Sequence, residues 1–162
     1  MGPDPRDHHD SYQRELAPET AGEPGDRFRR VAAAIRRYSI FPPRLVEGVL
    51  RRPIELDDTV GIHYRGLRLV RLFFAARVIA TFDGDDAGWW RAGFTYRTLV
   101  GHPELGEETF TVEKELATGR MRVALRSWSR PGTRLARVFS PLVRRLQVHA
   151  SERALDHLAC IA

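Results

Sequence analysis

The stretch Phe94-Thr-Tyr-Arg-Thr-Leu-Val-Gly-His-Pro-Glu-Leu-Gly-Glu-Glu-Thr-Phe110 decides the fold that we expect for this chain. Bulky residues alternate with polar ones at both of its ends, and a period of two is typical of a half-buried β-strand. Between the two ends lies a segment with two glycines and a proline, residue types that favour turns. The stretch therefore predicts two strands that meet at a loop, which carries a histidine and three acids.

The same alternation continues on both sides of this stretch. It covers residues 58–65 and 70–82 upstream and residues 110–116 and 121–127 downstream, with a hairpin turn at Thr118-Gly119. The run at 70–82 is long for one strand and predicts a bend or bulge within it. Successive strands joined by short turns predict an antiparallel sheet with one buried face and one exposed face.

Two segments show helical spacing. Asp26 suits a helix N-terminus, and apolar residues recur at helical intervals from Phe28 to Tyr38 before Pro42 and Pro43 end the helix.

A longer helix is expected over residues 133–158. Ser140-Pro141 interrupts it, so either the helix bends there or Ser140 begins a new segment with Pro141 at its first position. The apolar stripe of this helix consists of Leu135, Val138, Phe139, Leu142 and Leu146.

Three shorter elements complete the pattern. Residues 11–16 predict a short first strand, residues 45–50 one helical turn, and residues 83–86 a turn between strands. Residues 1–10 are expected to be a disordered tail, and residues 11–162 a single domain.

The composition is that of a soluble globular protein, with 43% hydrophobic and 29% charged residues. No apolar run approaches the roughly 20 residues of a transmembrane helix, and the N-terminus has no secretory signal pattern. A single cysteine favours a cytoplasmic location. The net charge of +5 comes almost entirely from arginine, but 21 acids are interspersed, so nucleic acid is not an expected partner.

This order of elements predicts an α+β fold. The buried face of the sheet needs a cover, and the long C-terminal helix with its single apolar stripe can supply it. We therefore expect a curved antiparallel β-sheet wrapped around a long C-terminal helix. That architecture resembles the helix-grip fold of the START and SRPBCC superfamily, a resemblance that implies a cavity between the sheet and the helix.

The loop between the two central strands holds the residues best suited to chemistry. His102 lies within seven residues of three glutamates, and a histidine beside a carboxylate such as Glu108 can perform acid–base catalysis. A purely structural hairpin connection is the alternative interpretation. The spacing of these residues matches no metal-binding motif, and we expect neither a metal nor a cofactor.

Strand phase sharpens this picture, because Glu108 lies two residues before Phe110 and so points to the buried face. Helical phase places His149 and Arg153 on the same side as Leu146, which predicts a polar end of the cavity. Alternatively, the helix has by then run past the edge of the sheet into solvent. The ligand-binding candidates are Trp90, Phe94, Tyr96, Thr98, Glu108, Phe110, Ser127, His149 and Arg153.

Two blocks of sequence carry a more specific resemblance. The first runs from Phe94 through Gly101-His102-Pro103 and Gly106-Glu107-Glu108 to Phe110, and the second is Ser127-x-Ser129-Arg130-Pro131. With these blocks the chain resembles the bacterial and plant family known as domain of unknown function nineteen-ninety. The resemblance implies a helix-grip type of fold and no established activity.

Three functions are compatible with these observations. The first is the binding of a small, largely apolar or amphipathic ligand in the cavity. The second is a cofactor-independent enzyme, of cyclase, hydrolase or isomerase type, that uses His102 and Glu108. The third is an interaction module whose arginine face binds anionic partners, formed by Arg71, Arg77, Arg91, Arg122, Arg126, Arg137 and Arg144.

Overall fold

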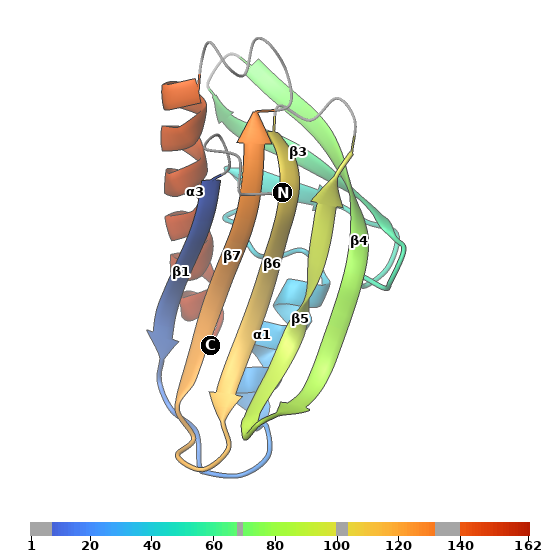
Figure 1. Ribbon diagram of the computed structural model, residues 1–162. Helices are drawn as coiled ribbons and strands as arrows, with labels where there is room; N and C mark the ends of the chain where they lie inside the picture. Colours follow the sequence, from blue (N-terminus) through green and yellow to red (C-terminus); the bar gives the residue numbers. More distant parts are fainter. Residues whose placement is uncertain (1–7, 68–69, 100–103, 132–139) are drawn as a thin grey trace, which may run out of the picture.

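Figure 1 shows the computed structural model, which describes residues 8–67, 70–99, 104–131 and 140–162. In chain order the elements are β1 (His8–Leu16), α1 (Asp26–Arg36), β2 (Val46–Val49), β3 (Thr59–Leu67), β4 (Val70–Asp86), β5 (Trp89–Thr98), β6 (Glu104–Glu115), β7 (Met121–Pro131) and α3 (Ser140–Ile161).

All of these strands belong to one antiparallel sheet in the order β1-β7-β6-β5-β4-β3-β2. The sheet curves, with α1 against β5 and β6 and with α3 against β1 and β7 (Figure 1). The predicted α+β class, with a curved antiparallel sheet and a C-terminal helix, is therefore confirmed. No helix in the described ranges is long and apolar enough to cross a membrane.

Several boundaries differ from the sequence-based expectation. Residues 8–10, expected in a disordered tail, begin β1, because they pair with Trp128 and its neighbours on β7. The helical turn expected at 45–50 is wrong: Val46–Val49 forms β2 and pairs with β3. The turn expected at 83–86 lies later, since β4 continues to Asp86 and the chain reverses at Ala87-Gly88, where both residues have positive φ.

One prediction about an irregular position is confirmed. The pairing of β4 with β5 shifts register between Val78 and Ala80, so the long strand contains the expected bulge. The described part of the C-terminal helix, α3, runs from Ser140 to Ile161. The choice between a bend at Ser140-Pro141 and a new segment depends on residues 132–139, which lie outside the described residues. The expected apolar positions at 135, 138 and 139 lie outside the described residues.

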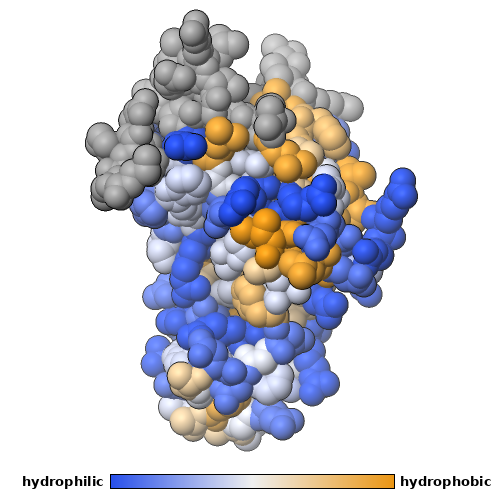
Figure 2. Space-filling view, turned by 45° about the vertical axis from the view of Figure 1, so that its right-hand side comes forward, coloured by the Kyte–Doolittle hydropathy of each residue, from blue (hydrophilic) through white to orange (hydrophobic). Residues whose placement is uncertain are grey.

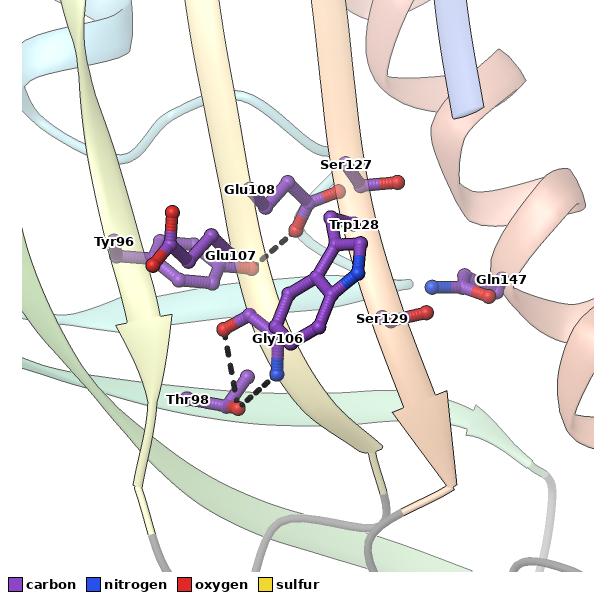
Figure 3. A pocket seen from close by; sticks show the side chains of 9 residues that line it. All are labelled: Tyr96, Thr98, Gly106, Glu107, Glu108, Ser127, Trp128, Ser129 and Gln147. Atoms are coloured by element: carbon purple, nitrogen blue, oxygen red, sulfur yellow. Dashed lines mark hydrogen bonds between the residues drawn. The ribbon is translucent and has the colours of Figure 1, made fainter. Parts of the chain in front are cut away.

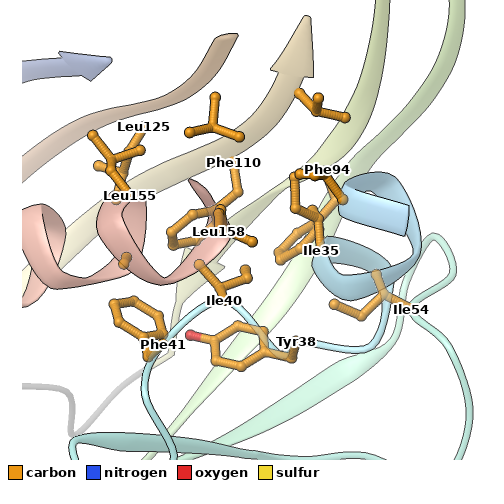
Figure 4. Packing of buried hydrophobic residues seen from close by; sticks show 14 of the residues in the cluster. Ile35, Tyr38, Ile40, Phe41, Ile54, Phe94, Phe110, Leu125, Leu155 and Leu158 are labelled. Atoms are coloured by element: carbon orange, nitrogen blue, oxygen red, sulfur yellow. The ribbon is translucent and has the colours of Figure 1, made fainter. Parts of the chain in front are cut away.

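Aromatic side chains form the centre of the core. Tyr38, just after α1, packs with Phe41 and with residues of β5 and β6 at ring-centroid distances of 6.0 to 6.4 Å. Phe94 and Phe110 lie opposite each other on β5 and β6, with their rings 5.6 Å apart (Figure 4). As their strand phase predicts, both are buried.

The outer surface of the molecule is mixed rather than uniformly polar. Figure 2 shows a largely hydrophilic face on which hydrophobic residues gather in the upper half. Phe73 and Val49 are 64% and 54% exposed, and both lie beside Gly61 of β3 on the outer side of the sheet.

A buried ion pair fixes α1 to the lower part of the sheet. Lys114 of β6, with 1% of its side chain exposed, donates to Glu19 at 3.0 Å and to the Glu23 carbonyl at 2.7 Å. The Glu19 carboxylate also accepts hydrogen bonds from the backbone amides of Gly25 and Phe28 at the start of α1. Burial favours the protonated form, but these hydrogen bonds outweigh it and lower the pKa of Glu19.

We predict that Lys114→Met lowers the free energy of unfolding by about 3–5 kcal/mol, because it leaves the Glu19 carboxylate buried without its counter-charge. The measurement is urea-induced unfolding at pH 7. Arg120→Met is the matched control, since Arg120 is exposed and lies 3.9 Å from Glu15. It should change stability by less than about 1 kcal/mol. Equal losses in both variants would contradict the structural role of Lys114.

The same pair should also be visible in the pH dependence of stability. A lowered carboxyl pKa stabilises the fold above the ordinary pKa of that group, and this contribution is lost as pH falls through the lowered value. The wild type should therefore lose stability between about pH 5 and pH 3. Lys114→Met should lose less over this interval, because one cause of the lowered Glu19 pKa is removed.

Candidate functional site

A pocket of about 200 Å³ lies between the sheet and α3. Residues from the segment after α1, from β2 to β6 and from α3 contribute to it, and most of them are apolar or aromatic. We call it the aromatic pocket; its lining residues are Tyr38, Phe41, Val46, Ile62, Tyr64, Leu72, Phe74, Tyr96, Glu108, Leu146, Gln147, Ala150 and Ser151.

A smaller and more polar pocket of about 40 Å³ adjoins it (Figure 3). The two pockets share Tyr96, Glu108 and Gln147, so an apolar compartment passes into a polar end. We call the smaller one the polar pocket; its lining residues are Tyr96, Thr98, Gly106, Glu107, Glu108, Ser127, Trp128, Ser129 and Gln147.

A chain of hydrogen bonds joins the two compartments. The Tyr96 hydroxyl donates to Oε2 of Glu108 across the β5–β6 pair. The hydroxyls of Tyr38 and Tyr96 are also hydrogen bonded.

The electrostatics of this chain keep both phenols protonated. Burial, followed by the nearby negative charge of Glu108, raises the pKa of Tyr96 and of Tyr38 well above the ordinary tyrosine range. Both tyrosines are therefore neutral hydrogen-bond donors at physiological pH. They orient the Glu108 side chain toward the boundary between the two pockets.

Hydroxyl groups line the remainder of the polar pocket. Thr98 is satisfied by Gly106, whose amide donates to its Oγ1 at 2.9 Å. The Ser127 and Ser129 hydroxyls project from β7 toward α3, whose Gln147 points back toward the sheet (Figure 3). Ser129 is 6% exposed, and its Oγ has no hydrogen-bond partner within the described part of the chain. A buried hydroxyl without a partner marks a place where a polar ligand atom or water can bind.

The structure brings together four of the predicted ligand-binding residues, Tyr96, Thr98, Glu108 and Ser127. Phe94 and Phe110 are buried among the aromatic core residues next to the pocket rather than in its wall.

Three other predicted residues lie elsewhere. Trp90 is near α1, where its indole donates to Asp83 at 2.8 Å. His149 and Arg153 are exposed on α3 and line neither pocket.

Helical phase explains why His149 and Arg153 were misplaced. Ser151 is buried against the sheet, and at about 100° per residue the positions two residues away point about 160° from it. The prediction took its phase from Leu146, which is only partly buried and lies at the margin of the inward side. Arg153 follows Leu146 by seven residues, or nearly two turns, so it points in almost the same direction but slightly further toward solvent.

The structure describes only one of the two residues of the acid–base hypothesis. Glu108 faces the pockets as strand phase predicts, and Glu107 pairs with Arg97 at 2.6 Å on the outer side. His102 and its neighbours from 100 to 103 lie outside the described residues. Within the described residues, no group of three or more histidine, cysteine, aspartate or glutamate side chains could hold a metal ion.

Sequence reasoning missed Tyr38, Phe41 and Gln147 as pocket residues. Tyr38 was assigned to the apolar side of a helix, but α1 ends at Arg36 and Tyr38 adopts a φ of 54°. Only the polar character of Gln147, one residue after Leu146 in an apolar stripe, could have indicated a role.

The arginine face is largely engaged in internal pairs. Arg122 and Arg126 lie 2.7 and 3.1 Å from Glu113, whose side chain is fully buried, and Arg91 lies at 3.8 Å. Burial opposes ionisation, but these guanidinium groups outweigh it and lower the pKa of Glu113.

Four members of that face remain. Arg144 binds Asp10, and Arg77 donates to the Asp57 carbonyl at 3.1 Å. The side chain of Arg71, like residue 137, lies outside the described parts.

The chain is similar to proteins of one family and to several solved structures. The model of a family described as "Domain of unknown function (DUF1990)" matches residues 2–157. A UPF0548 protein of Dictyostelium discoideum is 34% identical over 88 residues, which cover 53% of this chain and 40% of that protein. The matched region thus spans well under half of that relative.

Solved structures share the fold at low identity. A hypothetical protein of Helicobacter pylori superposes with a TM-score of 0.60 at 13% identity, covering 94% of this chain and 86% of that one. Norcoclaurine synthase from Thalictrum flavum, in complex with dopamine and hydroxybenzaldehyde, gives a TM-score of 0.54 at 10% identity and covers 96% of this chain and 86% of its own. These likenesses show the helix-grip fold alone.

We predict that Gly106→Ala destabilises the polar pocket and the strands around it. A Cβ atom at this position would lie 2.0 Å from the Trp128 carbonyl oxygen, so β6 and β7 would have to separate. The expected loss is about 1–3 kcal/mol in the free energy of unfolding, measured by urea denaturation. Gly84→Ala is the control, because its Cβ would meet no atom within 4 Å. If both variants are equally stable, the close approach at Gly106 is not a constraint.

Proposed function

This chain belongs to the DUF1990 family, and we propose that it binds a small, largely apolar ligand in the aromatic pocket. The observation that carries the proposal is the pocket itself, in which aromatic and aliphatic side chains from the sheet and α3 surround a single polar end. Ligand sites are commonly concave and apolar with a few polar groups that orient the ligand.

The size of the pocket limits the ligand. At about 200 Å³ the aromatic pocket is smaller than the roughly 300–1,000 Å³ typical of sites for drug-sized molecules. A single aromatic ring or a short aliphatic chain is therefore the appropriate scale. The similarly folded norcoclaurine synthase is described in complex with dopamine and hydroxybenzaldehyde, which supports small aromatic molecules as probes.

The two other functions receive less support. The arginines expected to attract anionic partners already contact Glu113 and Asp10, which neutralise part of their charge. Acid–base catalysis remains a hypothesis for Glu108, whose proposed partner His102 lies outside the described residues.

The neutral probe 2-phenylethanol tests the proposal. We predict that it binds the wild type in isothermal titration calorimetry, and that Ala150→Phe weakens binding at least tenfold. Ala150 lines the aromatic pocket, so a phenyl group there occupies the volume that the probe needs. Unchanged affinity in a folded Ala150→Phe variant, or no binding by the wild type, would contradict the proposal.

Two control variants use exposed positions on the same helix. His149→Phe adds the same side chain one residue earlier on the solvent side of α3 and should leave affinity unchanged. Arg153→Ala should also have no effect, because Arg153 lines neither pocket. Mass spectrometry of small molecules that co-purify with the wild type, compared with Ala150→Phe, would then identify natural ligands.

A further inference from the structure

The helix α3 presents hydrogen-bond donors to the polar pocket. Gln147 lines this pocket, and its Oε1 atom accepts a hydrogen bond from Nη1 of Arg144 at 3.3 Å. Arg144 is itself bound to Asp10 of β1. A guanidinium group can only donate hydrogen bonds, so it determines which end of the amide faces it. The Gln147 oxygen therefore points to Arg144, and the amide nitrogen, with its two protons, points toward β7 (Figure 3).

The opposite wall of the polar pocket supplies a hydroxyl without a partner. Ser129 of β7 is 6% exposed, and its Oγ atom forms no hydrogen bond within the described part of the chain. The hydroxyl points toward α3, as does that of Ser127 (Figure 3). A buried hydroxyl that remains unpaired costs free energy, which a polar group in the pocket recovers. The pocket volume of about 40 Å³ holds only a few water-sized atoms, so that group must be small.

We infer that the polar end of the ligand is an uncharged carbonyl group, whose oxygen accepts hydrogen bonds from Nε2 of Gln147 and from Oγ of Ser129. A carbonyl oxygen has two lone pairs and no proton, so it can accept from both donors at once. This inference rests on the proposed function and specifies the polar end of its ligand. The apolar body of the same ligand occupies the aromatic pocket, which shares Gln147 with the polar pocket.

Other polar groups match these two donors less well. A hydroxyl group brings a proton that needs an acceptor of its own. An ammonium group has three protons and no lone pair, so it would leave the amide protons of Gln147 unpaired. A buried carboxylate needs a counter-charge, and the donors from Gln147 and Ser129 are both uncharged. Glu108 takes no part in these ligand contacts, and its Oε2 atom accepts the hydroxyl proton of Tyr96.

Four probes that share a phenyl ring and a methyl-bearing carbon atom test this inference at pH 7. Acetophenone has a carbonyl group at that carbon, 1-phenylethanol a hydroxyl group, 1-phenylethylamine an ammonium group and cumene a second methyl group. By isothermal titration calorimetry we expect the wild type to bind acetophenone at least about threefold more tightly than the alcohol or the amine. Cumene is more apolar than the other three, so it serves to compare variants rather than to rank the probes.

Gln147→Leu and Ser129→Ala each remove one of the two donors. Each should weaken the binding of acetophenone by about fivefold, the scale of one lost hydrogen bond, and change the affinity for cumene by less than about twofold. Ser129→Ala should leave the free energy of unfolding unchanged or raise it, because the hydroxyl has no partner within the described residues. A structural role of Ser129 would instead appear as lost stability.

Two exposed positions provide matched controls. Gln13→Leu makes the same change as Gln147→Leu on β1, and Ser39→Ala makes the same change as Ser129→Ala in the segment after α1. Neither Gln13 nor Ser39 lines either pocket, so both variants should bind acetophenone as the wild type does.

The possible outcomes separate this inference from the proposed function. The inference is overturned by tightest binding of the alcohol or the amine, by unchanged acetophenone affinity in both pocket variants, or by equal losses for acetophenone and cumene. Each of these results leaves the proposed function intact. Failure of the wild type to bind any of the four probes also overturns the inference, and failure to bind 2-phenylethanol as well overturns both. The wild-type comparison needs no substitution, so it decides the inference even if a variant does not fold.

Discussion

The buried phenol of Tyr38 is the constraint on which the rest of the structure depends. It follows α1 with a φ of 54°, a conformation that costs a bulky residue about 1–3 kcal/mol. Packing against four aromatic rings offsets this cost, and its hydroxyl is held by Tyr96. Gly48 of β2 passes so close that a Cβ there would lie 2.5 Å from the Tyr38 ring. One side chain thus joins the end of α1, the edge strand β2 and the central strands, and it forms one wall of the aromatic pocket.

Buried charges divide the sheet into parts with different roles. At the α1 end, Lys114 is matched by Glu19, and this pair closes the start of a helix. On the outer side, Glu113 lies among arginines that the composition alone would assign to a binding surface. At the α3 end, Glu108 receives a hydrogen bond from a neutral phenol and borders two pockets. Ionic pairs of the first two kinds hold the fold together, whereas the third carboxylate lies at the boundary of two pockets.

Alternation along the strands was a reliable guide because the side-chain period of a strand is two and every residue has a fixed side. It placed Glu108 inward and Glu107 outward, and it put both Phe94 and Phe110 on the buried face. It could not identify β2, because four residues are too short to show a period. Nor could it reveal the conformation of Tyr38, which depends on rings that come from β5 and β6, more than fifty residues further along the chain.

Helical phase was less reliable, because each residue advances by about 100° around the helix axis. An error in the residue chosen as the centre of the buried side is therefore carried to every later position. Because Leu146 was taken as the centre of the inward side, Arg153 was predicted to face the pocket. In the structure, Gln147 and Ser151 line the pocket instead. Four of the predicted sheet residues thus line a pocket, whereas neither of the two predicted helix residues does. The error matters for function, because it exchanges an arginine for an amide and a hydroxyl at the polar end. With Arg153 in solvent, Gln147 and Ser151 are the polar groups that α3 contributes to the two pockets, and they face the strand pair that the Phe94–Phe110 stretch encodes.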